Sequence, residues 1–104
     1  MTKLMIKSDD DKLLKSDYKE QVSSIIKSAL EREKKVISSS IEISRKKLED
    51  FEKKYQLPTI DFFAKYQKGE MGDEADMIDW AGEYKMLLKL EDDLRKLEEI
   101  IVAG

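Results

Sequence analysis

Carboxylates are the residues in this 104-residue chain that could perform chemistry, because the sequence contains no Cys and no His. Their densest cluster comprises Glu70, Asp73, Glu74, Asp76 and Asp79. Carboxylate oxygens suit Ca²⁺ and Mg²⁺, but an EF-hand loop needs alternating ligands, a central Gly and a Glu at its last position, whereas Gly72 precedes most of these acids. Helix capping and the helix dipole account for acids here, so we expect no metal and no cofactor.

A catalytic role for these carboxylates is not supported by their surroundings. Two carboxylates can act as a general acid and a general base, but here they stand beside Lys residues in helical sequence. The chain has no glycine-rich phosphate loop and no motif around a Ser nucleophile. The lack of His removes the usual proton shuttle near neutral pH, and the lack of Cys excludes disulfides and thiolate zinc sites. We expect a protein that is not an enzyme and has no catalytic residues.

The charge of the chain divides unevenly along its length. Charged residues make up 41% of the sequence, and the net charge is −3. Residues 1–56 carry 14 basic and 11 acidic side chains, a net charge of +3, while residues 57–104 carry 6 and 12, a net charge of −6. The acidic half is suited to covering a basic partner. The basic doublets of the first half are interrupted by acids, which is typical of a solvated helix face and gives DNA binding little support.

Localisation follows from what the sequence lacks. No stretch approaches the roughly 18 apolar residues of a membrane span, and the start at Met1 shows no apolar core of a signal peptide. We therefore expect a cytoplasmic protein without a membrane partner.

The first half of the chain predicts one long helix. Residues 1–15 are expected to hold a short strand, over residues 2–7, and then a polar linker. From Ser16, placed as an N-cap, to Tyr55 there is no Gly or Pro, and apolar residues recur at helical spacing. Three serines at 38–40 mark where this helix could bend. The expected apolar stripe comprises Tyr18, Val22, Ile25, Ile26, Ala29, Val36, Ile37, Ile41, Leu48, Phe51 and Tyr55.

The second half predicts a short helix and then a long one. Pro58 ends the first helix, and residues 59–67 read as a short aromatic helix that Gly69 closes in the left-handed conformation. Asp73 is the expected N-cap of a last helix over residues 73–102. Its expected stripe comprises Met77, Trp80, Ala81, Tyr84, Leu87, Leu88, Leu94, Leu97 and Ile101.

These elements predict one all-α domain over residues 1–104. A helix of about 40 residues is about 60 Å long and cannot bury its stripe within one small globule. It must pack against a second long helix, a second subunit, or both. We therefore expect a long antiparallel helical hairpin, with the short aromatic helix at the bend, that forms a dimer.

Three segments in the middle of the chain resemble a group of small prokaryotic proteins. The segments are Phe51-Glu52-Lys53-Lys54-Tyr55, residues 62–73 and Asp76-Met77-Ile78-Asp79-Trp80-Ala81. They follow a pattern of F-E-x-K-Y, a helix bearing Phe, G-E-L-G-D and a W-A helix. This pattern is similar to that of the small all-helical antitoxin-like proteins of prokaryotic toxin–antitoxin pairs, and the similarity covers about residues 20–100.

The chain departs from this pattern at one turn and at one side chain. In the group, Gly and then a Ser or Thr cap follow the position of Tyr55, whereas this chain continues with residues 56–59, Gln-Leu-Pro-Thr. The turn before the short helix is therefore built differently. Met71 replaces the usual Leu, which is a volume-conserving change.

The resemblance implies a protein that binds and neutralises a cognate toxin, as a homodimer. Inhibition by occlusion needs apolar anchors rimmed by complementary charge, and the acidic half is expected to face a basic, RNA-binding toxin. The expected partner-binding residues are Phe62, Phe63, Tyr66, Gly69, Gly72, Asp73, Trp80 and Tyr84. The alternative role of the aromatic residues among them is to form the core of the hairpin.

Two other functions compete with this one. A self-associating helical scaffold without a toxin partner would show only a loss of stability on Gly69→Ala or Asp73→Ala. A specific inhibitor is expected to lose partner binding on Phe62→Ala or Trp80→Ala while remaining folded. Binding of operator DNA by the N-terminal strand and the basic helix is the third function, although the uninterrupted helix does not fit helix-turn-helix spacing.

Overall fold

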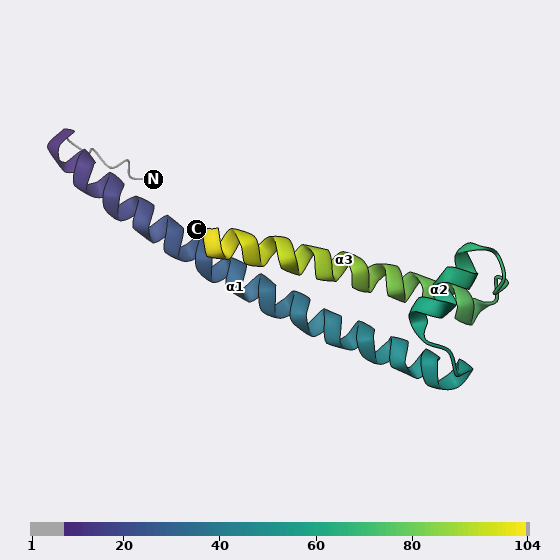
Figure 1. Ribbon diagram of the computed structural model, residues 1–104. Coiled ribbons are helices and arrows are strands. Elements are labelled where there is room, and N and C mark those ends of the chain that lie inside the picture. The colour runs from purple at the N-terminus through teal and green to yellow at the C-terminus, as the bar shows by residue number, and fades with distance from the viewer. Residues whose placement is uncertain (1–7, 104) are drawn as a thin grey trace.

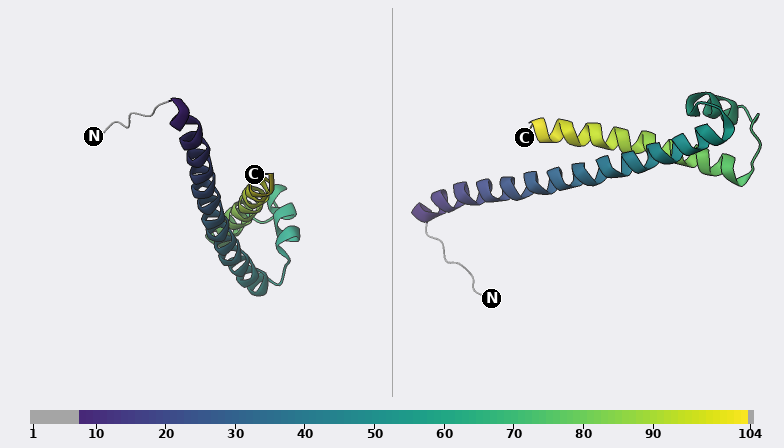
Figure 2. Two further views of the ribbon diagram at one scale, coloured as in Figure 1. Left: turned by 90° about the vertical axis from the view of Figure 1, so that its left-hand side faces the viewer. Right: turned by 90° about the horizontal axis from the view of Figure 1, so that it is seen from below.

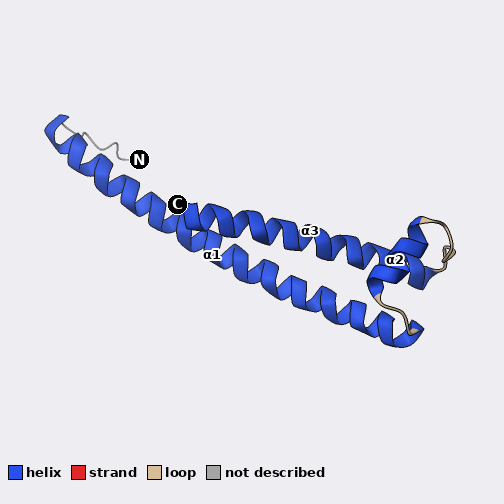
Figure 3. Ribbon diagram, in the orientation of Figure 1, coloured by secondary structure: helices blue, strands red, loops and turns tan. Residues whose placement is uncertain are grey.

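The computed structural model describes residues 8–103, which form three α-helices and no strand. These are α1 (Ser8–Tyr55), α2 (Thr59–Gln67) and α3 (Ala75–Ala103), shown in Figures 1 and 3. The all-α prediction is confirmed for this part of the chain, and the strand expected over residues 2–7 lies outside it. None of the helices in the described range combines the length and apolar character needed to cross a membrane.

α1 begins earlier than the sequence pattern predicts. It starts at Ser8, so the expected start at Ser16 is wrong and residues 8–15 are helix instead of linker. No Gly or Pro interrupts these residues. α1 also continues without a break through the serines at 38–40.

The end of α1 depends on a left-handed residue that is not glycine. Gln56 has φ of 53°, and the N–H of Leu57 bonds to the carbonyl of Glu52 at 3.3 Å, which closes the last turn. The side chain of Gln56 also donates from Nε2 to the carbonyl of Lys53 at 2.8 Å. Pro58 then occupies the N-cap position of α2 in an extended conformation, so the chain turns sharply between the two helices.

The connection from α2 to α3 contains two glycines with positive φ. Gly69, at φ 77°, lies just past the end of α2, as predicted; the N–H of Gly69 bonds to the carbonyl of Tyr66 and that of Glu70 to the carbonyl of Lys65, both at 3.0 Å. This is the Schellman arrangement. Gly72 is also left-handed, at φ 74°.

Asp73 is not the N-cap of α3. The helix starts at Ala75, and the carbonyl of Glu74 accepts the first helical hydrogen bond, from the N–H of Ile78 at 3.1 Å. Glu74 therefore takes the N-cap position. The left-handed turn at Gly72 keeps Asp73 in the loop, so the predicted helix start at residue 73 is two residues early.

α1 and α3 pack side by side in antiparallel directions (Figures 1 and 2). Four ion pairs show this order, because the residue number rises on α1 while it falls on α3: Lys34–Glu98, Arg45–Glu91, Lys47–Glu83 and Lys54–Asp76. Each cation lies on α1 and each acid on α3. Part of the basic charge of the first half is thus matched within the chain.

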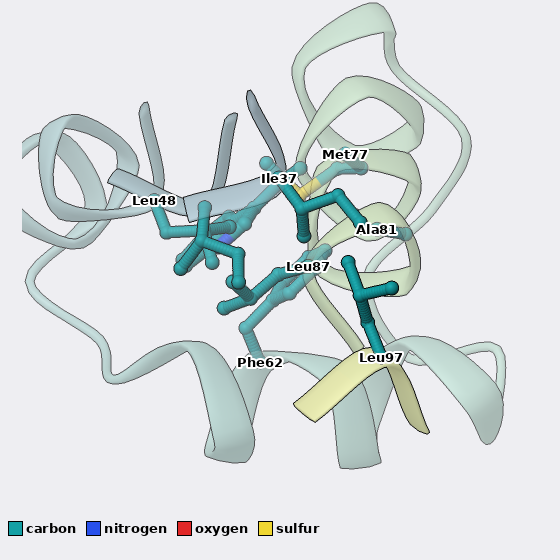
Figure 4. Packing of buried hydrophobic residues seen from close by; sticks show 9 residues of the cluster. Ile37, Leu48, Phe62, Met77, Ala81, Leu87 and Leu97 are labelled. Carbon is teal, nitrogen blue, oxygen red and sulfur yellow. The ribbon is translucent and has the colours of Figure 1, made fainter. Parts of the chain in front are cut away.

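The core lies between the two long helices and beneath α2 (Figure 4). Its buried apolar residues are Ile37, Ile41, Leu48, Phe62, Met77, Trp80, Ala81, Leu87 and Leu97. The predicted stripe on α1 is covered only in part within the chain, because the exposed fraction is 67% at Tyr18, 66% at Ile25 and 59% at Val36. α1 has 48 residues and α3 has 29, so the N-terminal part of α1 projects past the C-terminal end of α3 (Figure 1).

Candidate functional site

Trp80 is the centre of a stack of aromatic rings at the bend. Its indole lies parallel to the ring of Phe62, with centroids 3.8 Å apart, and neither side chain is exposed to solvent. Phe51 and Tyr55 of α1 stack on the same indole, with centroid distances of 5.5 and 5.7 Å. We call these four residues the Trp80 cluster. It joins α1, α2 and α3, so it sets the position of the short helix on the hairpin.

Two hydrogen bonds complete the polar side of the Trp80 cluster. The indole N–H of Trp80 donates to Oγ1 of Thr59 at 3.0 Å, and Thr59 is itself buried. The backbone N–H of Thr59 donates to Oε2 of Glu52 at 2.6 Å. Glu52 on α1 therefore satisfies one of the free N–H groups at the start of α2, where its negative charge also suits the helix dipole. Because Pro58 supplies no side-chain cap, this carboxylate takes that role from a neighbouring helix.

Asp76 connects the end of α1 to the start of α3. Its Oδ2 accepts hydrogen bonds from Lys54 Nζ at 2.6 Å and from the Tyr55 hydroxyl at 2.5 Å. The hydrogen bond from Lys54, followed by that from Tyr55, holds the pKa of Asp76 below its ordinary value. In turn, the hydrogen bond to Asp76 raises the pKa values of Lys54 and Tyr55. Asp76, one of the acids clustered in the sequence, thus links α1 to α3.

A second group of aromatic residues, from α2 and α3, packs at the edge of the core. Phe63 meets Tyr84 edge to face, with ring centroids 4.9 Å apart, and lies 6.4 Å from Tyr66. All three are half-buried against the core, and Ile60 beside them on α2 is 71% exposed. We call these four residues the outer patch. These four residues form a partly exposed apolar surface at the bend.

The structure separates the predicted partner-binding residues into three groups. Phe62 and Trp80 are fully buried, so a partner cannot reach them unless the hairpin opens. Phe63, Tyr66 and Tyr84 lie together in the outer patch. The remaining three, Gly69, Gly72 and Asp73, are exposed residues of the loop before α3.

One surface feature was not predicted from the sequence. An open groove runs between α1 and α3, and Gly82 widens it because it has no side chain there. Ser44 and Glu83 line this groove, and the hydroxyl of buried Ser44 donates a hydrogen bond to Oε2 of Glu83 at 2.5 Å. The apolar residues on its walls are Ile43, Phe51, Ile78, Met86 and Leu90. A signal for it exists in the sequence, since Val36 and Ile43 stand seven residues apart beside the core positions 37 and 44.

The arrangement is suited to packing and binding. Among residues 8–103, no group of three His, Cys, Asp or Glu side chains is placed to hold a metal ion. No buried side-chain nitrogen or oxygen in the described part of the chain lacks a hydrogen-bond partner. No protein-family model matches the chain, and no curated protein or solved structure shows significant similarity to it.

Proposed function

We propose that this chain is a non-enzymatic antitoxin-like protein that neutralises a small cognate toxin by covering its surface. The observation that carries the proposal is the outer patch, where Phe63, Tyr66 and Tyr84 stand exposed in part beside Ile60. Aromatic side chains on a fixed base are typical anchors of protein interfaces, because they supply a large contact area and lose little rotamer freedom on binding.

The Trp80 cluster supplies that fixed base. Phe62 immediately precedes Phe63 on α2, and its stacking on Trp80 holds the short helix in one orientation. The bond from Thr59 to Glu52 fixes the same helix at its N-terminus. A preorganised patch binds more tightly than a flexible one, since less conformational freedom is lost on association.

The charge around the outer patch favours a basic partner. Asp61, Glu70, Asp73 and Glu74 are exposed in α2 and the loop after it, against Lys65 and Lys68, while Lys53 of α1 and Lys85 of α3 are exposed nearby in sequence. Elsewhere on α3, acids such as Glu91 and Glu98 are paired with cations of α1. An acidic rim around apolar anchors complements the basic surface of an RNA-binding toxin and speeds the encounter with it.

The resemblance to antitoxin-like proteins supports the proposal through the roles of its pattern residues. Phe51 and Tyr55 of the F-E-x-K-Y segment stack on Trp80, while Glu52 caps α2. Gln56 adopts the left-handed conformation at the position where the group has Gly. These residues all build the bend, so the segments that carry the resemblance are also the ones that position α2.

The experiment is a growth assay with the protein encoded by the adjoining reading frame. We expect its expression to arrest growth and coexpression of this chain to restore growth. The double variant Phe63→Ala/Tyr84→Ala should remain helical by circular dichroism and bind the toxin about 10-fold or more weakly in calorimetry. Leu88→Ala is the matched control, since Leu88 is a 45% exposed residue of the same helix outside the patch. A neighbour that is harmless, or full rescue by the double variant, would overturn the proposal.

The alternative function, a self-associating scaffold without a toxin partner, is favoured by the exposed apolar residues of α1. Under that function, the variants of the outer patch change neither growth nor association. We further propose that the protein acts in the prokaryotic cytoplasm and forms a homodimer, since within residues 8–103 no second helix covers the projecting part of α1.

A further inference from the structure

Gly82 lies inside α3 at a position where nothing in the described part of the chain requires glycine. Its φ is not positive, and a Cβ at this residue would meet no atom within 4 Å. A glycine inside a helix is less favourable than an alanine, because it loses more conformational freedom on folding. The space that Gly82 leaves empty belongs to the groove between α1 and α3, which we call the α1–α3 groove. This glycine therefore keeps the groove open although its own helix would be more stable without it.

The α1–α3 groove has the length of one docked helix. Its lining residues run from residue 40 to 54 on α1 and from residue 76 to 90 on α3. At 1.5 Å per residue each wall is about 21 Å long, which matches a helix of about 14 residues. The side chains of Ile43, Ile78 and Met86 on these walls are 58%, 51% and 52% exposed. Apolar grooves of this kind accept the apolar face of an amphipathic helix.

The two lysines that line the groove are already paired with acids of its opposite wall. Lys47 lies 3.8 Å from Glu83, and Lys54 lies 2.6 Å from Asp76. No other basic side chain of the described residues lines the groove. Its positive charge is thus fully matched within the chain.

Asp50 on α1 and Asp79 on α3 also line the groove, and their charges are not matched. The ion pairs formed within residues 8–103 include neither carboxylate. In sequence, Asp50 lies between Lys47 and Lys54, and Asp79 lies between the two acids that pair with them, so both carboxylates occupy the same stretch of the groove. The α1–α3 groove therefore has two unmatched negative charges, one on each wall, in the stretch that contains Gly82.

We propose that the α1–α3 groove binds an amphipathic helix of a basic partner protein. The apolar face of that helix packs against Ile43 and Met86, close to the backbone at Gly82, and its Lys or Arg side chains reach Asp50 and Asp79. Complementary charge steers such a helix toward the groove and fixes its position there. A second copy of this chain is a poorer occupant, because two grooves stacked on each other would bring four unmatched carboxylates together.

The α1–α3 groove and the outer patch lie on opposite sides of α3. Gly82 and Tyr84 of the outer patch are two residues apart, and a helix of 3.6 residues per turn rotates by about 200° over that interval. The groove is therefore a second binding surface. Its proposed role goes beyond the binding of a toxin through the outer patch and does not depend on it.

The first test uses a synthetic peptide of about 14 residues, with Leu on one helical face and Lys on the other. Calorimetry should show that it binds the native chain. We expect Gly82→Gln to raise the dissociation constant about 10-fold or more, because the new side chain fills the groove without changing the net charge. Ser39→Gln is the matched control, since Ser39 is an exposed helical residue outside the groove. Gln is a better helix former than Gly, so Gly82→Gln should also unfold at a higher temperature, which separates lost binding from lost folding.

Two results of this test would contradict the proposal. One is a native chain that does not bind the peptide, and the other is equal affinity of Gly82→Gln and Ser39→Gln. Sedimentation equilibrium of the chain without peptide examines the other occupant. If Gly82→Gln alone converts a dimer to a monomer, a second copy fills the groove and the proposal is wrong.

The second test examines the charge of the groove. Asp50→Asn/Asp79→Asn should weaken binding of the Lys peptide about 10-fold. Asp17→Asn/Glu20→Gln makes the same change of charge at exposed residues on the projecting part of α1 (Figure 1) and should have little effect. Equal effects of the two double variants would show that net charge alone attracts the peptide, against a site in the groove. Neither test uses a toxin, so their failure leaves the growth assay unaffected, and the failure of that assay leaves them unaffected.

Discussion

The rings of Phe62 and Trp80 are stacked face to face, with their centroids 3.8 Å apart and their planes within 2° of parallel. Phe62 comes from the short helix α2 and Trp80 from α3, and both side chains are completely buried. This single contact fastens the bend to the hairpin. It gives the two residues the core role that the sequence analysis names as the alternative to partner binding.

Replacing either ring should destabilise the protein severely. We expect Phe62→Ala and Trp80→Ala each to lower the free energy of unfolding by about 3 to 5 kcal/mol, because each leaves a cavity within the stack. Urea denaturation followed by circular dichroism measures this change. Phe63→Ala, at the half-buried neighbour of Phe62, is the control and should lower the free energy of unfolding by clearly less. If Phe62→Ala and the native chain unfolded at the same urea concentration, Phe62 could not be packed in a buried stack with Trp80.

The hydrogen bond from Trp80 to Thr59 is testable with a substitution that keeps the shape of the side chain. Thr59→Val removes the hydroxyl and leaves a buried indole N–H without an acceptor, so we expect a loss of about 1 to 3 kcal/mol. Thr59→Ser retains the oxygen and loses only a methyl group, with an expected cost of about 1 kcal/mol. If Ser costs more than Val in thermal unfolding, packing and not the hydrogen bond is what matters at this position.

The link between Asp76, Lys54 and Tyr55 predicts a dependence of stability on pH. The pKa of Asp76 is held below its ordinary value of 3.8, mainly by the hydrogen bond from Lys54, so the folded state favours the carboxylate. Its contribution is therefore present above pH 3.8 and is lost as the pH falls through the lowered pKa. In urea titrations across this range, Asp76→Asn should show a smaller loss of stability on acidification than the native chain. If the free energy of unfolding fell equally with pH in both proteins, Asp76 would not form this link.

The same link should weaken again in alkali. The pKa values of Lys54 and Tyr55 are raised above 10.5 and 10.0, mainly by their hydrogen bonds to Asp76, so their contribution is present below those values. It is lost as the pH rises through the raised pKa values, because both groups lose the proton that Asp76 accepts. Tyr55→Phe removes the hydroxyl but keeps the ring on Trp80, and it should reduce the alkaline loss. An unchanged alkaline transition in this variant would assign the loss to other groups.

Gln56 offers a substitution that should stabilise the chain. Its φ of 53° is strained for a residue with a Cβ, so Gln56→Gly should raise the free energy of unfolding by about 1 kcal/mol. Gly69→Ala is the reverse experiment at φ 77°, where no atom blocks the new Cβ, and it should cost about 1 kcal/mol through backbone strain alone. Thermal unfolding compares the two variants, and a destabilised Gln56→Gly would show that the side-chain bond to Lys53 outweighs the strain.

The all-helical fold was predictable because its signals are local. The absence of Gly and Pro before Gln56, the position of Pro58 and the left-handed Gly69 each act within a few residues. The start of α1 and the N-cap of α3 were missed, because several polar residues in sequence can each begin a helix. The first helix was expected at Ser16 and the last at Asp73, but they begin at Ser8 and Ala75.

The roles of individual side chains were harder to predict, because they depend on contacts between helices. Periodicity places Val36 and Ile37 on the same broad stripe, yet Val36 is 59% exposed and Ile37 is 9% exposed. The difference arises because α3 covers only one edge of that stripe. Glu52 reads from the sequence as a solvated charge, and its bond to Thr59 is apparent only when α2 is folded back against α1.

The position of the Trp80 cluster at the closed end of the hairpin has a consequence for the order of folding. Thr59 and Trp80 are 21 residues apart in sequence, whereas Arg45 and Glu91, farther along the rods, are 46 apart. The entropy lost in closing a chain segment grows with its length, so contacts at the bend form at the lowest cost. We therefore expect α1 and α3 to pack together first near the bend and then progressively toward their free termini. Amide hydrogens should then exchange slowest near Trp80 and progressively faster toward Ala103, as a chain that frays from its open end requires.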